Sequence, residues 1–368
     1  MAKEYEFEMY GHPSMYGIKE RKLNVYFSEP EQGVNTETGI LLLIAGFGGH
    51  SNSNVYKKMR NVFADTYNLI TIQCDYFGWE FMQGPNNISL NTDREQLNKL
   101  LKKEEINYIY QDDNIFNRLM EVHSANRINI SAKEILNETL ENYNDMGLIQ
   151  AIDNVSAVIN VIEIIKDNGY EFNRDKIILY GNSHGAYLSY LSNAIAPELF
   201  SLLIDNSSWL FPTYLKNNRN VFSTYGDTTL SVEFDYMAKS LVIDNEMLDL
   251  NSLYKKFNNN CDIISYHGTN DNLISHKDKK NLKQFVKYFK YIEIGVENID
   301  NKIFKSNQHG LGADFLELFD FTIKDYKFGL NSKHDFEKQN DVIYRTENFQ
   351  YTITYENIVP ELTIKNMA

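Results

Sequence analysis

The stretch that decides the fold is Ile177-Ile178-Leu179-Tyr180-Gly181-Asn182-Ser183-His184-Gly185-Ala186-Tyr187. Its aliphatic first half is typical of a buried strand, and its second half is typical of a tight turn that opens a helix. The turn fits the pattern Gly-x-Ser-x-Gly, in which a serine is held on a strained corner with its hydroxyl exposed. Small residues flank the serine because strand and helix approach closely there. Alone, the pattern also fits an ordinary glycine-containing turn, so its meaning depends on the rest of the chain.

Segments with the patterns of strands and helices alternate on both sides of this stretch. Nearly continuous aliphatic runs, typical of strands covered on both faces, occur at 39–45, 69–74, 199–204, 261–266 and 291–296. Helical spacing occurs at 55–65, 146–166, 186–196, 276–288 and 313–324. Residues 5–10 and 22–28 alternate polar with apolar side chains and predict an opening antiparallel pair. This order predicts an α/β fold with a mostly parallel central sheet and helices on both faces.

One segment interrupts the alternation. Residues 86–145 are polar, charged and helix-favouring, and Ser131-Ala132-Lys133-Glu134 has the form of a capping box that predicts a helix running towards Tyr143. We expect a helical insertion that folds over the sheet edge, either as a lid or as a surface elaboration without a role in binding. Irregular sequence at 210–260 could supply a second part of the lid. The core would then comprise residues 1–85 and 146–330, and residues 331–368 would form a C-terminal extension without an assigned role.

The composition excludes several classes of protein. The chain has 43% hydrophobic and 23% charged residues, as soluble globular proteins do, and a formal net charge of −14 that opposes nonspecific binding to nucleic acid and anionic membranes. The N-terminus is acidic where a signal peptide is basic, and no apolar run is recognisable as a membrane span, so we expect a cytoplasmic protein. The sequence gives no indication of the oligomeric state.

Two further expectations concern single residue types. Cys74 and Cys261 each lie inside an apolar strand-like run, which predicts buried free thiols rather than a disulfide. The lysines of the basic stretch 277–290 are expected on the solvated face of a helix.

A serine at neutral pH needs a base, a group that orients the base, and donors for an oxyanion. Polar residues that could fill these roles follow predicted strands, at the sheet edge where open α/β folds place their sites. Ser183 is the candidate nucleophile and His309 the candidate general base. Asp271 is the candidate acid that orients the imidazole, and Asp205, at the end of the strand after the elbow, is the alternative.

Other histidines and the glycine loop complete the list of candidates. His267 and His276 lie too near the strand of the acid to be preferred as the base. The backbone N–H groups of His184 and Phe47 are the candidate oxyanion donors, with Gly48 as the alternative to Phe47. Gly48 and His50 are also candidate substrate contacts.

Three more residues, Asp75, Trp79 and Trp209, lie at the ends of other predicted strands. Core packing is the preferred explanation of both tryptophans.

The joint order of these features resembles the α/β-hydrolases from about residue 20 to about residue 325. The resemblance rests on the elbow and on four further segments: the glycine loop 46–49, Asp75-Tyr76-Phe77-Gly78, His267-Gly268-Thr269-Asn270-Asp271, and His309-Gly310. It implies a serine hydrolase that works through an acyl-enzyme. The whole chain, including Asn144-Asp145-Met146-Gly147, is also similar to an uncharacterised bacterial family of DUF2920-type proteins. That resemblance implies a connection with surface-glycan or flagellin modification and an acetyl or other short acyl group on a sugar.

The expected activity is therefore hydrolysis of a carboxylic ester, an O-acetyl or other short acyl ester of a small molecule or glycan. No phosphate-binding loop, dinucleotide fingerprint, zinc-binding helix or cysteine cluster occurs in the sequence, so we expect neither a cofactor nor a metal. Acyl transfer to a sugar hydroxyl would use the same triad. Peptidase-like amide hydrolysis would call for an acidic pair that captures an amine, and none is evident. A noncatalytic binding protein on the same fold is the alternative from a different class, and a distance between Ser183, Asp271 and His309 too large for hydrogen bonds would favour it.

Overall fold

The central sheet of the protein is mostly parallel. The computed structural model describes residues 1–17, 19–92, 94–122, 128–225, 228–241, 244–329, 339–356 and 359–367. Within these residues eight strands form one sheet in the order β1-β2-β4-β3-β7-β8-β11-β12. They are β1 Lys3–Gly11, β2 Arg21–Glu29, β3 Gly39–Ile44, β4 Leu69–Cys74, β7 Ile177–Asn182, β8 Leu202–Asn206, β11 Asp262–Gly268 and β12 Phe289–Ile294. β2 pairs antiparallel with β1 and β4, and every other pair is parallel, which confirms the predicted sheet.

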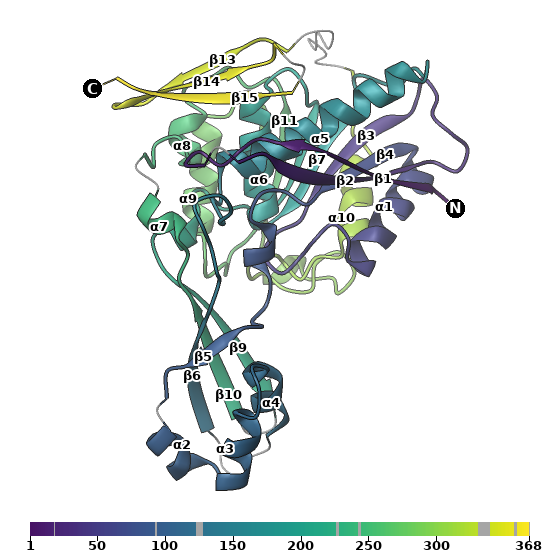
Figure 1. Ribbon diagram of the computed structural model, residues 1–368. Helices are drawn as coiled ribbons and strands as arrows, with labels where there is room; N and C mark the ends of the chain where they lie inside the picture. The colour runs from purple at the N-terminus through teal and green to yellow at the C-terminus, as the bar shows by residue number, and fades with distance from the viewer. Residues whose placement is uncertain are drawn as a thin grey trace.

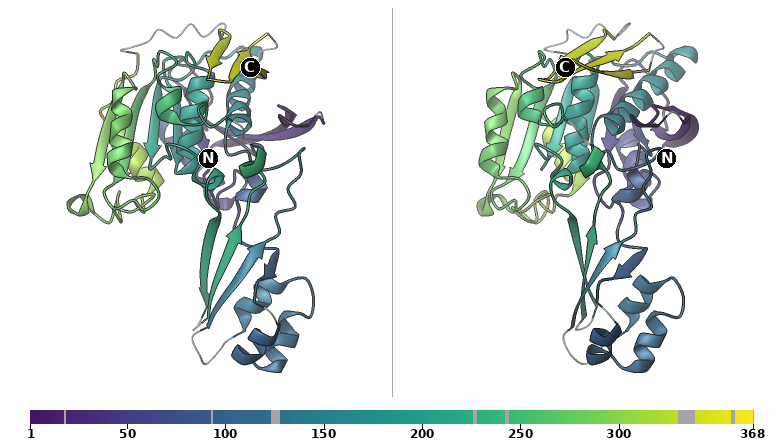
Figure 2. Two further views of the ribbon diagram at one scale, coloured as in Figure 1. Left: turned by 90° about the vertical axis from the view of Figure 1, so that its left-hand side faces the viewer. Right: turned by 60° about the vertical axis from the view of Figure 1, so that its left-hand side comes forward.

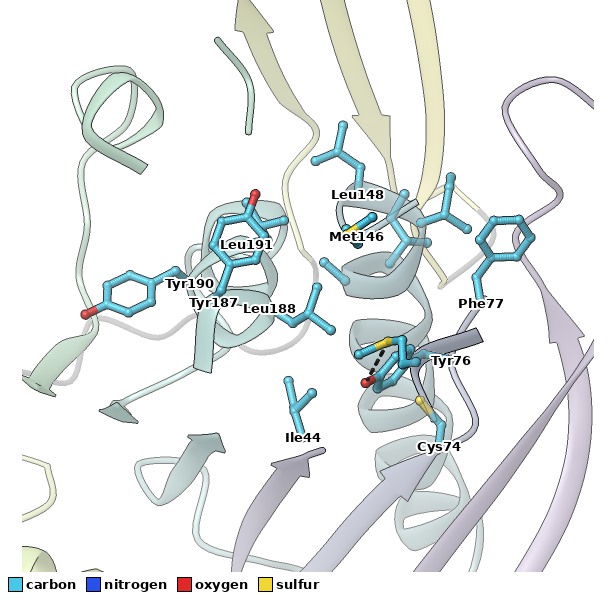
Figure 3. Packing of buried hydrophobic residues seen from close by; sticks show 14 of the residues in the cluster. Ile44, Cys74, Tyr76, Phe77, Met146, Leu148, Tyr187, Leu188, Tyr190 and Leu191 are labelled. Carbon is cyan, nitrogen blue, oxygen red and sulfur yellow. Dashed lines mark hydrogen bonds between the residues drawn. The ribbon is translucent and has the colours of Figure 1, made fainter. Parts of the chain in front are cut away.

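Helices cover both faces of this sheet (Figure 1). One face carries α5 Leu148–Asp167 and α6 His184–Ile195, and the other carries α1 Asn54–Tyr67 and α10 Phe315–Ile323. Because side chains alternate along a strand, neighbours in β3 enter different cores: Leu42 lies in the cluster with α5 and α6, and Leu41 in the cluster with α1 and α10. Figure 3 shows the first cluster, with Leu188 of α6 and Ile44 of β3 pointing into the space between the helices and the strand ends.

α5 is the central helix of the first cluster. An 18-residue window of it has a mean hydropathy of 1.6, which makes the helix long and apolar enough to cross a membrane by length and composition alone. The expectation that no apolar run has the length and composition of a membrane span is therefore wrong. In the structure 83% of that window is buried inside the protein, as expected of a helix that packs on a sheet beside a second helix.

Short helices connect the remaining core elements. They are α7 Ala238–Leu241, α8 Leu250–Leu253, α9 His276–Asn281, and the 3-10 helices η1 Trp79–Met82, η2 Thr213–Leu215, η3 Leu282–Gln284 and η4 Val296–Asn298. The helix predicted at 276–288 is thus an α-helix only in its first half. Cys74 and Cys261 are buried and free, as predicted.

The insertion differs from the predicted helical segment. It is a four-stranded sheet in the order β5-β6-β10-β9 with three short helices. Its elements are β5 Ile88–Leu90, α2 Arg94–Leu100, α3 Lys103–Ile109, α4 Ile115–Glu121, β6 Ile128–Glu134, β9 Arg219–Tyr225 and β10 Thr228–Phe234. In Figure 2 this unit projects from the core, with its helices at the far end.

The predicted helix start at 131–134 is wrong, because these residues belong to β6. Ile130 and Ala132 are buried, and β6 pairs with β5 and in parallel with β10. Pairing of β6 on both edges and burial of its alternate side chains on one face of the sheet outweigh the local capping pattern. The partner strand β10 comes from the irregular region 210–260, so two distant segments build one unit.

The C-terminal extension is a three-stranded antiparallel sheet formed by β13 Val342–Arg345, β14 Phe349–Thr354 and β15 Glu361–Asn366. It packs over the C-terminal end of α6. Tyr344 Oη donates to the carbonyl of Ala194 over 2.6 Å, and Tyr355 Oη donates to that of Ile195 over 2.7 Å. Both tyrosines are buried, so the extension is part of the core packing.

Candidate active site

The serine of the elbow sits on a strained backbone. Ser183, between β7 and α6, has φ 56° and ψ −120°, a region that residues with a side chain rarely adopt. The flanking glycines are required by close approach, because a Cβ on Gly185 would overlap the carbonyl of Ile44 and one on Gly181 would overlap the amide of Ala186. This backbone conformation costs free energy, and it holds the hydroxyl of Ser183 in a fixed place.

The structure brings the three candidate triad residues into one hydrogen-bonded line. Ser183 Oγ donates to His309 Nε2 over 2.7 Å, and His309 Nδ1 donates to Asp271 Oδ2 over 2.8 Å. The other carboxylate oxygen of Asp271 accepts from the backbone amides of Leu273 and Ile274 at 2.8 and 3.0 Å. Burial raises the pKa of the Asp271 carboxyl, but the hydrogen bond and charge of His309 and the amide of Ile274 outweigh it and leave that pKa below its ordinary value.

The alternative acid has a different partner. Asp205 Oδ2 lies 2.7 Å from Lys279 Nζ, and both side chains are completely buried. Burial raises the pKa of Asp205, but the charge and hydrogen bond of Lys279 and the hydroxyls of Ser265 and Tyr190 together outweigh burial and lower that pKa. The expectation that the lysines of 277–290 are solvated is therefore wrong for Lys279, because this lysine pairs with a buried carboxylate.

His267 lies next to the triad acid, with its Nε2 3.4 Å from Asp271 Oδ2 and 3.0 Å from the carbonyl oxygen of Ile274.

The glycine loop after β3 approaches the elbow closely. A Cβ on Gly46 would lie 2.7 Å from the carbonyl of Asn182. The amide of Gly48 donates to the carbonyl of Met82 over 2.9 Å, so it is already occupied. Among the described residues, the amides of Phe47 and His184 donate to no acceptor. The geometry therefore favours Phe47 over Gly48 as the second amide available to an oxyanion.

The rings of two histidines near this loop, His184 and His50, are packed against other side chains. The His184 side chain is completely buried and its Nε2 donates to Gln150 Oε1 over 2.7 Å. Burial lowers the pKa of His184 to about 3, so its ring is neutral. The ring of His50 lies 5.3 Å from that of Trp79, and its Nδ1 is buried without a partner.

Asp75 accepts from the hydroxyls of Tyr26 and Ser51 and so belongs to the packing around β4.

Beside the elbow lies an aromatic cluster that the sequence did not predict. The ring of Phe47 lies 5.4 Å from Trp209, 5.1 Å from Tyr214 and 6.2 Å from Tyr236. Cζ of Arg219, at the start of β9, lies 4.9 Å from the same ring. Only the packing of the insertion base against the glycine loop brings these residues together, and no local motif marks them.

The insertion base is also hydrogen-bonded to the core. Arg219 Nη1 donates to the carbonyls of Met82 and Gln83 over 3.1 and 2.8 Å. Since Met82 also accepts from the amide of Gly48, one carbonyl connects the insertion with the glycine loop. Within the described part of the chain, no group of three or more His, Cys, Asp or Glu residues could hold a metal ion.

Comparisons with known proteins place the chain in one family by sequence. A family model described as "Protein of unknown function (DUF2920)" matches residues 5–216. No curated protein sequence matches the chain.

Among solved structures, Est1E from Butyrivibrio proteoclasticus with bound ferulic acid is 16% identical, with a TM-score of 0.44 over 82% of this chain and 93% of that one. A cold-adapted esterase from an Arctic intertidal metagenomic library is 11% identical, with a TM-score of 0.43 over 87% and 92%. The acylaminoacyl peptidase of Pyrococcus horikoshii is 10% identical, with a TM-score of 0.44 over 80% of this chain and 37% of that one. These likenesses concern the fold alone.

Proposed function

This chain belongs to the DUF2920 family, and we propose that it is a serine hydrolase that cleaves carboxylic esters through an acyl-enzyme on Ser183. The observation that carries the proposal is the line of hydrogen bonds from Ser183 through His309 to Asp271. The strained backbone of Ser183 supports it, because such strain persists where the surrounding structure holds a residue for a task.

In the acylation step, Ser183 Oγ attacks the ester carbonyl carbon while its proton passes to His309 Nε2. The carbonyl oxygen becomes an oxyanion, which would accept hydrogen bonds from the free amides of Phe47 and His184. Asp271 holds the imidazole with Nδ1 protonated and stabilises its positive charge. The carbon–oxygen bond to the alcohol then breaks, and His309 gives its Nε2 proton to the departing alkoxide.

Deacylation repeats these steps with water as the nucleophile. His309 Nε2 takes a proton from the water as its oxygen attacks the acyl carbon, and the oxyanion again faces the two amides. Collapse of the intermediate breaks the bond to Ser183 Oγ, which recovers the proton. The products are an alcohol and a carboxylic acid.

For the substrate, we propose a short acyl ester, such as an O-acetyl group, on a small polar alcohol or carbohydrate. The aromatic cluster supports this choice, because aromatic faces pack well against acyl groups and sugar rings.

The test combines covalent labelling with turnover. A fluorophosphonate probe should label the wild-type protein, and the variants Ser183→Ala and His309→Ala should lose labelling and at least about 10³-fold in p-nitrophenyl acetate turnover. Ser189→Ala is a matched control, since it removes another buried serine hydroxyl from α6 without touching the triad. Undiminished turnover in Ser183→Ala would reject the proposal. Acetylated xylan, acetylated sialic acid and unbranched nitrophenyl esters of increasing chain length would then compare acyl groups and alcohols.

A further inference from the structure

One arginine beside the glycine loop has no carboxylate partner. Arg219 is the first residue of β9, and only 9% of it is exposed. Its guanidinium packs against two aromatic rings, with Cζ 4.9 Å from the ring of Phe47 and 4.8 Å from that of Phe234. Among the described residues, arginine–carboxylate ion pairs are those of Arg21 and Arg118, and Arg219 has none.

One edge of this guanidinium is used and another is free. Nη1 donates to the carbonyls of Met82 and Gln83 and, over 3.4 Å, to Tyr236 Oη. Nε and Nη2 donate to no described residue, and neither atom is fully buried. These two nitrogens share one edge of the planar group, where two parallel N–H bonds match the two oxygens of a carboxylate. Arg219 therefore presents a fixed pair of unused donors.

The carboxylate whose charge acts together with that of Arg219 is already bonded elsewhere. Burial raises the pKa of Glu134, at the end of β6, and the backbone amides of Asn87 and Asn86 and the charge of Arg219 offset this only in part. Both carboxylate oxygens of Glu134 accept from the amide of Asn86 over 3.2 Å, and Oε1 also accepts from that of Asn87 over 2.8 Å. Glu134 therefore leaves the free edge of Arg219 open. Taking a guanidinium out of water without an anion costs free energy, which a bound anion recovers.

The free edge lies close to the proposed oxyanion site. Phe47, whose ring packs against the guanidinium, carries one of the two amides that would hold the oxyanion. The same ring lies 5.3 Å from that of His184, the residue that carries the other amide. Phe47 is half-buried and Gly48 beside it is exposed, so this side of the site is open to a substrate.

We propose that Arg219 binds a carboxylate group of the ester substrate, so that the enzyme acts on short acyl esters of hydroxy acids or acidic sugars. This inference rests on the proposed function and names its substrate class. Because the proposed acyl group is short, the carboxylate belongs to the alcohol part. Its two oxygens accept from Nε and Nη2 while Ser183 attacks the acyl carbon. The net charge of −14 repels anions in general, so this local positive charge decides whether an anionic ester binds.

Two aryl acetates of similar size test the proposal. One is m-carboxyphenyl acetate, and the other is m-carbamoylphenyl acetate, in which a neutral amide replaces the carboxylate. We expect the wild type to have a kcat/KM at least about 10-fold higher for the carboxylate ester, mainly through a lower KM. Arg219→Gln should abolish this preference, and Arg219→Lys, which keeps the charge but loses the paired donors, should keep part of it. The ratio of the two esters is the readout, because a general loss of turnover cancels in it.

Binding without turnover separates this inference from the proposed function. Calorimetric titration of Ser183→Ala with m-carboxyphenyl acetate should give a Kd in the millimolar range or tighter. The double variant Ser183→Ala/Arg219→Gln should bind this ester at least about 10-fold more weakly. Lys216→Gln is the matched control, since it removes an exposed cation near Arg219 in the chain and should change the ratio by less than about twofold.

The two proposals fail in different ways. Equal kcat/KM for the two esters in the wild type, or a wild-type ratio in Arg219→Gln, would overturn the carboxylate site and leave the esterase proposal in place. No turnover of either ester and no fluorophosphonate labelling would reject the proposed function. Calorimetry would then still decide the site, because equal binding by Ser183→Ala and the double variant, or no binding by either, would overturn it. Melting curves show which variants are folded, and Arg219→Lys replaces Arg219→Gln in this comparison if the latter is not.

Discussion

Replacing each of the two candidate acids by asparagine separates chemistry from stability. In Asp271→Asn, the asparagine oxygen can still accept from the amides of Leu273 and Ile274, but its NH₂ group then faces His309 Nδ1. The imidazole must turn to the tautomer with its proton on Nε2. That nitrogen can no longer take the proton of Ser183.

The two substitutions are expected to change different quantities, kcat for Asp271→Asn and the free energy of unfolding for Asp205→Asn. Loss of the correct tautomer should lower kcat by about 10⁴-fold, or about 5 kcal/mol of transition-state stabilisation. Asp205→Asn leaves the triad intact but removes the negative charge that pairs with the ammonium of Lys279, whose side chain is completely buried. Breaking a buried pair costs about 3–5 kcal/mol of folding free energy. For a chain of 368 residues, this lowers the melting temperature by about 4–6 °C.

The assay is turnover of p-nitrophenyl acetate together with thermal unfolding, both at one pH and temperature. Asp271→Asn should lose turnover with a melting temperature close to that of the wild type. Asp205→Asn should show the reverse, a lower melting temperature with kcat within about threefold of wild type. If Asp205→Asn lost as much turnover as Asp271→Asn while still folded, the assignment of the acid would be refuted.

Three further predictions concern the glycine loop, the insertion base and the start of α5. Gly46→Ala should lower kcat by about 10- to 100-fold because its Cβ displaces the loop from the elbow, whereas Gly84→Ala, with open space around it, should not. Arg219→Lys keeps the charge but loses the planar contact with Phe47, so kcat should fall while fluorophosphonate labelling persists. Burial raises the pKa of Asp145 to about 7, which costs the folded protein stability as the pH rises through that value. The stability of Asp145→Asn relative to wild type should therefore increase by about 2–3 kcal/mol between pH 5 and pH 8, as measured by urea unfolding.

Much of the core could be predicted because its signals are local. The aliphatic runs of β3, β4 and β7 follow from burial on both faces, and the elbow follows from glycines that close approach requires. The chain order of Ser183, Asp271 and His309 indicated which strand ends carry the polar groups. Parallel strands bring such ends to one edge, so the spatial meeting of the three side chains could be anticipated without a structure.

Features that depend on distant partners could not be predicted in this way. β6 resembles a helix start until β10, about one hundred residues later, is known to pair with it. Lys279 resembles the solvated lysines around it until Asp205 is placed beside it in the core. In each case a tertiary contact of large sequence separation overrides the local pattern.

Contacts between residues far apart in the sequence also indicate whether the insertion can move as a lid. Arg219 donates to the carbonyls of Met82 and Gln83, and Tyr236 Oη donates to that of Phe81, so three hydrogen bonds hold the insertion base to the segment after β4. If each contributes about 1 kcal/mol, a swing that broke all three would cost on the order of 3 kcal/mol. The swung state would then hold less than about 1% of the molecules. We therefore infer that the insertion base acts as a fixed wall beside the glycine loop, and that any motion is confined to the strands and helices beyond it.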